Sequence, residues 1–498
     1  MIVRNARLVP VTPVPDLPDR PVDVLVEDGR VVEVGAGLAR PAGVEEYDAA
    51  GRWLVPGLWD QHTHLGQWSL TATRLDLAAA DSPEHALDLT RAWLAEHPGR
   101  PLVGFGHRPA VWERQPTVAE LDEVAGEVPV VLIAGDAHHA WLSSSAQRAL
   151  GLAVRDDFVY ENEWFAAYAD LPGLVGNDGI SPAGYQNALN RAASKGVVGL
   201  VDFEFGGGPT DWVERWAEGC DVLRVRVAMY ADRLEEVIAA GLRSGDRLLP
   251  DDDRLTMGPL KIISDGSLNT RTAWCCEPYA DGGLGAANQS AEELRRLISR
   301  ASASGLEVAT HAIGDAAVAH ALDVYAATGA RGSIEHAQLV ARDDVRRMAG
   351  VAVRASVQPA HLLDDRDLSE QIWPDRGDRC FAFRWMLDAG VPLVLGSDAP
   401  VAPLDPWLAI AAAVHRSGDA RDPWHAEHAL TPAEALAASV DFQPTVGVGS
   451  RADLVLLDRD PLLDAGDSDN GSAEVAEQLR TMPVALTVAA GVVRHSTL

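Results

Sequence analysis

The chain has 498 residues, of which 47% are hydrophobic and 23% are charged, and its formal net charge at pH 7 is −31. This length suggests several domains, or one large barrel with additions. The acidic balance argues against nucleic acid and anionic membranes as partners, because their phosphate groups would be repelled.

The termini and the cysteines suggest the cellular compartment. The N-terminal segment MIVRNARLVP has no basic region, long apolar run or cleavage site, so no signal peptide is expected. No apolar stretch approaches the roughly 20 residues that span a bilayer. The four cysteines, including the adjacent Cys275 and Cys276, form neither a disulfide framework nor a CxxC metal pattern. We therefore expect a reduced, cytoplasmic compartment.

Both ends of the chain have the pattern of short β-strands. Residues 22–26 and 31–34 are rich in apolar side chains, and a turn lies between them, which predicts a β-hairpin. Residues 453–457 and 484–488 repeat this pattern near the C-terminus. We predict one small β-sandwich, built from residues 1–56 together with residues 441–498.

The middle of the chain alternates short apolar runs with helical stretches. Near-continuous apolar runs are typical of strands that are buried on both faces of a parallel sheet. Eight such runs occur, at residues 53–58, 197–202, 222–229, 259–264, 306–310, 332–335, 351–357 and 391–396. Eight β/α units predict an α/β fold with a TIM-type (β/α)8 barrel, formed by residues 57–75 and 182–440.

About a hundred residues separate the first run from the second, which is too long for an ordinary βα connection. This stretch has strand patterns of its own at residues 101–106 and 128–135, and helical patterns at 84–96 and 144–150. We predict that residues 76–181 form an inserted α/β subdomain over the barrel mouth.

The strongest chemical signal is a His-x-His pair, His62 and His64, that follows the first run. Residues i and i+2 of a strand point to the same face, so both imidazoles can bind one ion. An isolated His-x-His is weak evidence. Here, however, the end of a barrel strand places the pair at the mouth, where active sites of this fold lie.

Four later runs carry side chains of matching chemistry at the same end of the barrel. Lys261 lies inside an apolar strand, where a bare ammonium is costly unless it is paired or chemically changed. His311, His336 and Asp398 follow the fifth, sixth and eighth runs. Each could be a satisfied polar group of the core, but together they indicate a metal site.

The order of these residues along the barrel resembles the amidohydrolase superfamily. The segments KIISDGSL, THAIGD, IEHAQ and GSDAP look like the branch that contains N-substituted formamide deformylases and YtcJ-like hydrolases. This resemblance covers nearly the whole chain. It implies that His62 and His64 bind one divalent ion, expected to be zinc, and that His311 and His336 hold a second. Lys261 would be N-carboxylated and would bridge the two ions.

The resemblance also implies the reaction. Asp398 would bind the first ion and accept the proton of the attacking water, and a metal-activated hydroxide would cleave a C–N bond in an amide, N-formyl or related linkage. The sequence leaves open whether one ion is bound or two. A deaminase of a small ring is an alternative, but such relatives have a Glu where this chain has Leu339. A non-catalytic scaffold is a further alternative, although such relatives have lost metal ligands that this chain retains.

A second group of residues is expected to contact a small-molecule substrate. Its members are Trp68, Asp136, His138, Trp141, Arg271, Gln358 and His361. For those in the insertion the alternative is a structural turn, and for Arg271 it is a salt bridge within its own loop. Glu161 and Glu163 are expected to be solvated or part of a lid. The oligomeric state is left open, with a homodimer as one alternative.

Overall fold

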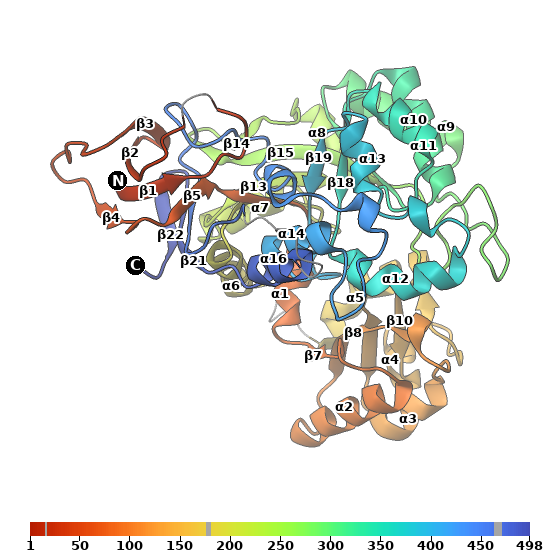
Figure 1. Cartoon of the computed structure of the whole chain (residues 1–498). Coiled ribbons are helices and arrows are strands. Elements are labelled where there is room, and N and C mark those ends of the chain that lie inside the picture. Colours follow the sequence, from red (N-terminus) through yellow and green to blue (C-terminus); the bar gives the residue numbers. More distant parts are fainter. Residues whose placement is uncertain (15–16, 176–180, 463–470) are drawn as a thin grey trace.

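The computed structural model describes residues 1–498 except 15–16, 176–180 and 463–470. It has three parts: a barrel, a sheet that combines both chain ends at the left in Figure 1, and a subdomain that lies below the barrel in this view. Within the described ranges, none of the helices combines the length and the apolar character that crossing a bilayer needs.

The barrel confirms the predicted TIM-type architecture. Eight strands run parallel in the order β6 (Leu58–Thr63), β12 (Val197–Asp202), β13 (Arg224–Met229), β15 (Asp252–Ile263), β16 (Val308–Ala312), β17 (Gly332–His336), β18 (Val353–Val357) and β19 (Leu393–Leu395). A short strand, β14 (Arg247–Leu249), pairs antiparallel with β15. The barrel closes where Thr63 forms a parallel bridge with Ala399, which follows β19.

The first predicted strand was placed wrongly. The apolar run 53–58 contains β5 (Trp53–Pro56), which belongs to the sheet of the chain ends, and only the first residue of β6. Pro56 and Gly57 separate the two strands. A Cβ on Gly57 would lie 2.3 Å from Val198 of β12, so only glycine allows this close approach. Barrel strand one therefore begins five residues later than predicted and includes His62.

Helices surround the barrel and bury apolar side chains, and several of them begin at a residue whose side chain caps the helix. In α9 (Ala291–Ala303), for example, Ser290 accepts from the backbone N–H of Glu293, and Leu294, Leu297 and Ile298 are buried. The other helices of this layer are α1 (Leu65–Thr71), α6 (Pro182–Ser194), α7 (Pro209–Ala217), α8 (Leu234–Ala239), α10 (Asp315–Thr328), α11 (Arg342–Ala349), α12 (His361–Ile372), α13 (Phe383–Asp388), α14 (Pro406–His415), α15 (Pro432–Ala437) and α16 (Gly471–Arg480). Like α9, the helices α6, α14 and α15 begin at a residue whose side chain caps the helix.

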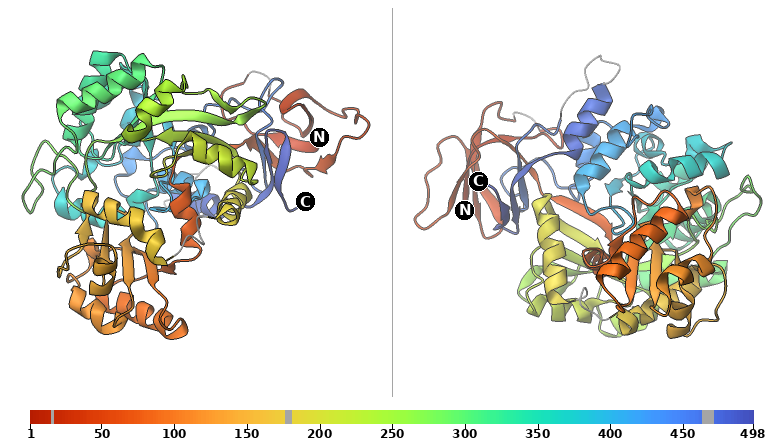
Figure 2. Two further views of the ribbon diagram at one scale, coloured as in Figure 1. Left: turned by 180° about the vertical axis from the view of Figure 1, so that it is seen from behind. Right: turned by 90° about the horizontal axis from the view of Figure 1, so that it is seen from below.

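The chain ends form one continuous path of strands. Its order is β22 (Val492–Ser496), β21 (Val484–Ala489), β20 (Leu454–Leu457), β5, β1 (Ile2–Leu8), β2 (Val22–Glu27) and β3 (Arg30–Gly35), with β4 (Glu46–Asp48) beside β1. The first residues of β1 pair with β2 and β4, and its last two pair with β5. Residues from both halves, such as Val24 and Leu456, share one hydrophobic core. Both termini lie at this sheet (Figures 1 and 2).

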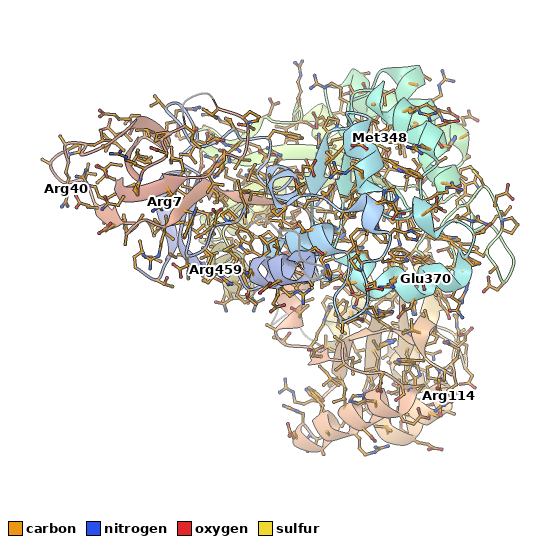
Figure 3. The ribbon with its side chains drawn as sticks, in the orientation of Figure 1. Arg7, Arg40, Arg114, Met348, Glu370 and Arg459 are labelled. Carbon is orange, nitrogen blue, oxygen red and sulfur yellow. The ribbon has the colours of Figure 1, made fainter. Side chains whose placement is uncertain are left out.

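The insertion is an α/β unit with its own sheet, in the order β11 (Val159–Tyr160), β10 (His139–Leu142), β9 (Val130–Ala134), β8 (Leu102–His107) and β7 (Leu75–Asp76). Its helices are α2 (Pro83–Glu96), α3 (Val118–Ala125), α4 (Ser144–Ala149) and α5 (Glu161–Val175), and they bury two apolar clusters against the sheet. Arg114, labelled in Figure 3, pairs with Glu84 of α2 and Glu120 of α3 and so joins these helices.

Candidate metal centre and active site

Three predicted ligands meet where the barrel closes. His62 lies on β6, His64 caps the start of α1, and Asp398 follows β19. Oδ1 of Asp398 lies 3.2 Å from Nε2 of His64 and 3.5 Å from Nε2 of His62. All three side chains are buried, and their ligand atoms lie within 4.8 Å of one another.

The backbone holds this trio in place. The N–H of Asp398 donates to the carbonyl of His62 at 2.7 Å, and the N–H of His64 donates to the carbonyl of Ala399 at 2.8 Å. Asp398 has a φ of 57°, in the left-handed region that non-glycine residues rarely adopt. Strained backbone of this kind persists where the surrounding structure enforces it, and it concentrates at functional sites.

A second trio lies beside the first. His336 ends β17 with a φ of 71°, and His361 begins α12. Ligand atoms of His336, His361 and Asp398 lie within 4.8 Å of one another, so Asp398 belongs to both trios. His361 was predicted as a substrate contact, and the structure places it among the possible ligands as well. The ring of His311 lies 4.5 Å from that of His336, while its Nε2 lies 3.3 Å from the carbonyl of Gly266.

Lys261 lies between these groups on β15. Its Nζ is 3.1 Å from Nε2 of His62 and 4.4 Å from the ring centroid of Phe203. No carboxylate of the described residues forms an ion pair with it, although only 3% of the residue is exposed. Burial lowers the pKa of Lys261 to about 8. A buried amine without an ion-pair partner among the described residues therefore lies beside the first trio.

Glu335 is a site residue that the sequence interpretation missed. Its Oε2 lies 2.8 Å from Nδ1 of His62, and Oε1 accepts from the hydroxyl of Ser333. Burial opposes the charge of Glu335, but the hydrogen bond from His62 lowers the pKa of this carboxyl to about 2. Because Nδ1 of His62 is engaged in this way, Nε2 is the nitrogen that faces the cluster. The signal was present, since Glu335 is a charged residue inside a buried strand, as Lys261 is.

The donor set fits a divalent metal ion. Imidazole nitrogens and a carboxylate oxygen face one another, and the buried Nδ1 of His336 and Nε2 of His361 have no hydrogen-bond partner within the described part of the chain. Burial lowers the pKa of His311 to about 3 and that of His336 well below its usual value. These rings are therefore neutral at pH 7, the state in which imidazole binds metals.

The predicted substrate contacts separate into two groups. Asp136, His138 and His361 line the cavity above the cluster, together with Phe165 and Phe205. The remaining four, Trp68, Trp141, Arg271 and Gln358, are not among its lining residues.

Each residue of the second group has a structural partner. The indole N–H of Trp141 donates to the carbonyl of Thr117 inside the insertion, and Trp68 lies beside Arg191. Arg271 pairs with Asp281 of its own loop at 2.7 Å. Gln358 donates to the carbonyl of Ser356 at 3.3 Å.

Of the two alternatives expected for Glu161, a solvated position is wrong. Glu163 is solvated and pairs with Arg155, as expected of a surface residue. Glu161 is instead mostly buried, and its carboxylate contacts His138 at 3.0 Å. Sequence alone could not separate the two residues, because they lie two positions apart at the start of the same helix, α5.

Comparison with known proteins identifies the family of this chain. The sequence matches the amidohydrolase family over residues 45–495. The chain belongs to the amidohydrolase family. This confirms the resemblance on which the ligand assignment was based.

Several relatives of this amidohydrolase are known. It is 28% identical to Protein LONG AFTER FAR-RED 3 of Arabidopsis thaliana, over 82% of this chain and 76% of that protein. It is 26% identical to N-substituted formamide deformylase of Arthrobacter pascens, over 95% and 94% of the two chains. A metal-dependent hydrolase of uncharacterised function from Pyrococcus horikoshii has the same fold, with a TM-score of 0.75, 26% identity and coverage of 93% and 98%. This amidohydrolase is therefore a metal-dependent hydrolase.

Proposed function

We propose that this amidohydrolase cleaves the C–N bond of an amide, N-formyl or related linkage in a small molecule, with one or two zinc ions held by the cluster at the barrel mouth. The observation that carries the proposal is the position of Asp398. Its buried carboxylate is shared by both trios, with Oδ1 3.2 Å from His64 and Oδ2 3.9 Å from His361. The relative that acts on N-substituted formamides and aligns over most of both chains supports the same bond class.

The chemistry follows from the residues. A zinc ion bound by such ligands lowers the pKa of its water from about 15.7 to near 7 and polarises a carbonyl oxygen. Asp398 would accept the proton of the attacking water and deliver it to the leaving nitrogen, which is general acid–base catalysis. Glu335 keeps His62 in the orientation that directs Nε2 to the cluster.

Lys261 supports a site that binds two ions. Its amine nitrogen can bond to the carbon of carbon dioxide and release a proton, which gives a carbamate with two ligand oxygens. The absence of an ion-pair partner among the described residues and the lowered pKa of Lys261 favour the neutral amine that this reaction needs. One ion would then be held by His62, His64, Asp398 and the carbamate, and the other by His311, His336 and the carbamate.

Metal content is the first test. Protein expressed with zinc and bicarbonate is measured by plasma mass spectrometry beside Lys261→Ala and His62→Ala, and release of amine from N-substituted formamides and simple amides is followed. We expect about two ions per chain, with fewer in both variants, as for a bridged pair. About one ion per chain, unchanged by Lys261→Ala, would contradict the carbamate bridge. A folded protein without metal or amine release would overturn the proposed function.

A further inference from the structure

The insertion places one histidine directly over the cluster. His138 lies in the turn between β9 and β10, and its ring centroid is 6.1 Å from that of His311. The turn is held by two contacts. Oδ1 of Asp136 accepts from the N–H of His138 at 3.0 Å, and the indole of Trp164 donates to the carbonyl of Ala137 at 2.9 Å. His138 lines the same cavity as Lys261 and Asp398.

Glu161 fixes the ring of His138. Its Oε2 lies 3.0 Å from Nδ1 of His138, and its N–H donates to the carbonyl of the same residue at 2.8 Å. Oε1 accepts from the hydroxyls of Thr270 and Thr272, at 2.7 and 2.8 Å. Both oxygens are thus engaged, which favours the ionised carboxylate. Glu161 also has a φ of 46°, so the fold enforces an unfavourable backbone conformation at this position.

The contact joins two parts of the molecule. Thr270 and Thr272 belong to the loop that follows β15, the strand of Lys261. Oδ2 of Asp136 accepts from the hydroxyl of Ser267 in the same loop at 3.2 Å. A Cβ at Gly266 would lie 1.8 Å from Oγ1 of Thr272 in the same loop and 3.2 Å from Oε1 of Glu161, so the fold of this loop against Glu161 needs glycine there. Several contacts therefore determine where His138 sits relative to the cluster.

One nitrogen of His138 remains free for a ligand. Nδ1 is engaged by Glu161, whereas Nε2 has no hydrogen-bond partner among the residues that the structure describes, and 16% of the side chain is exposed at the cavity. The Glu161 carboxylate, 3.0 Å from Nδ1, favours the imidazolium form of this ring. An imidazolium carries a proton on both nitrogens, so Nε2 is a hydrogen-bond donor.

We propose that His138 is a further catalytic residue, whose Nε2–H donates a hydrogen bond to the substrate carbonyl oxygen as that oxygen becomes negatively charged, and that Glu161 is its positioning residue. This inference rests on the proposed hydrolysis of a C–N bond. The oxygen of a water molecule bonds to the carbonyl carbon, the π electrons move to the carbonyl oxygen, and one proton of that water goes to Asp398. The electron pair on the carbonyl oxygen then re-forms the C=O bond, the C–N bond breaks, and the leaving nitrogen takes the proton from Asp398. A fixed donor aimed at this oxygen stabilises the transition state more than the substrate.

Kinetics of the zinc-loaded full chain test the role. His138→Ala should lower kcat by about 100-fold, the typical effect of losing one oxyanion donor, and leave KM within about threefold. His138→Gln, which retains an N–H donor, should recover part of the loss. Glu161→Gln should lower kcat less than His138→Ala does. Two controls should have the kcat of the wild type: Glu163→Gln on the same helix as Glu161, and His85→Ala on the surface of the insertion. Metal content should be unchanged throughout.

A binding measurement separates this role from the proposed function. Methylphosphonate is a tetrahedral anion that mimics the charged oxygen, and its affinity is measured by calorimetry. We expect about tenfold weaker binding to His138→Ala than to the wild type and His85→Ala, and a smaller loss for His138→Gln, which retains a donor. If the wild type hydrolyses no amide, the proposed function fails, yet this difference would still support the subsite. Equal affinity in all proteins, or loss of metal from the His138 variants, would overturn the proposal.

Discussion

Glu335 orients the ring of His62, although Glu335 itself is not expected to contact the substrate. Its carboxylate engages Nδ1 of His62 at 2.8 Å in a buried environment, which leaves Nε2 for the cluster. Removing such an orienting partner typically lowers metal affinity 10- to 100-fold. We therefore expect Glu335→Ala to weaken zinc binding by about this factor, measured by competition with a chromogenic chelator. Glu335→Gln, which keeps a hydrogen-bond acceptor for Nδ1, should weaken it less, and equal affinities in all three proteins would contradict the orienting role.

At the level of single residues, the sequence identified groups whose type is unusual for their position. Histidines at strand ends and a lysine in an apolar strand stand out without any structure. Glu335 and Glu161 were missed because their roles depend on partners that are distant in sequence. Glu335 and His62 are 273 positions apart, and Glu161 reaches Thr270 over 109. Trp141 shows the opposite error, since its place in a motif near the mouth did not reveal that its ring packs inside the insertion.

Among the elements, the short helix α15 depends on one carboxylate. Glu434 forms a capping box with Thr431 and a bidentate pair with Arg384 of α13, at 2.8 and 2.6 Å. The hydrogen bonds from Arg384 lower the pKa of Glu434 to about 2. A lowered carboxyl pKa adds stability above its unfolded pKa of about 4.3, and this stability is lost as the pH falls towards 2.

We expect Glu434→Gln to lower the free energy of unfolding at pH 7 by about 1 kcal/mol, a value discounted because the pair is partly exposed. The difference from the wild type should narrow as the pH falls below about 4.3. Urea denaturation at pH 7, 5 and 4 measures this difference in the free energy of unfolding. Glu33→Gln on the exposed side of β3, where no ion pair is present within the described ranges, serves as the control. A difference that stays constant with pH would show that the charge of Glu434 does not matter.

Elements were predictable because apolar runs mark buried strands whichever sheet they join. This explains both the success and the error at the start of the barrel. The run 53–58 is apolar throughout, but Pro56 and Gly57 divide it between two sheets. The two helices predicted in the insertion, at residues 84–96 and 144–150, agree with α2 and α4 to within two residues. Ser82 and Ser143 provide the N-caps of these helices.

The arrangement of the whole molecule followed in outline from one geometric fact: a closed barrel brings its own ends together, so both chain ends can share one sheet. The contacts between the parts did not follow. Asp453, just before β20, is completely buried, and Oδ2 accepts from Nε of Arg224 on barrel strand β13 at 2.8 Å. Oδ1 accepts from the N–H of Ala490, after β21, at 2.7 Å. This carboxylate therefore links the barrel to two segments of the C-terminal part of the sheet.

Removing one member of a buried ion pair leaves the other charge uncompensated, which typically costs about 3–5 kcal/mol. We expect Asp453→Ala to lower the free energy of unfolding by this amount in urea denaturation, with metal content unchanged because the cluster lies at other strand ends. Asp253→Ala is the matched control: its carboxylate also pairs with Arg224, at 3.2 Å, but is 57% exposed, so it should cost less than about 1 kcal/mol. Arg224→Met combined with Asp453→Leu should recover much of the loss, since an apolar pair leaves no buried charge unpaired. If Asp453→Ala and Asp253→Ala were equally mild, the ion pair of Asp453 with Arg224 would not hold the terminal sheet to the barrel.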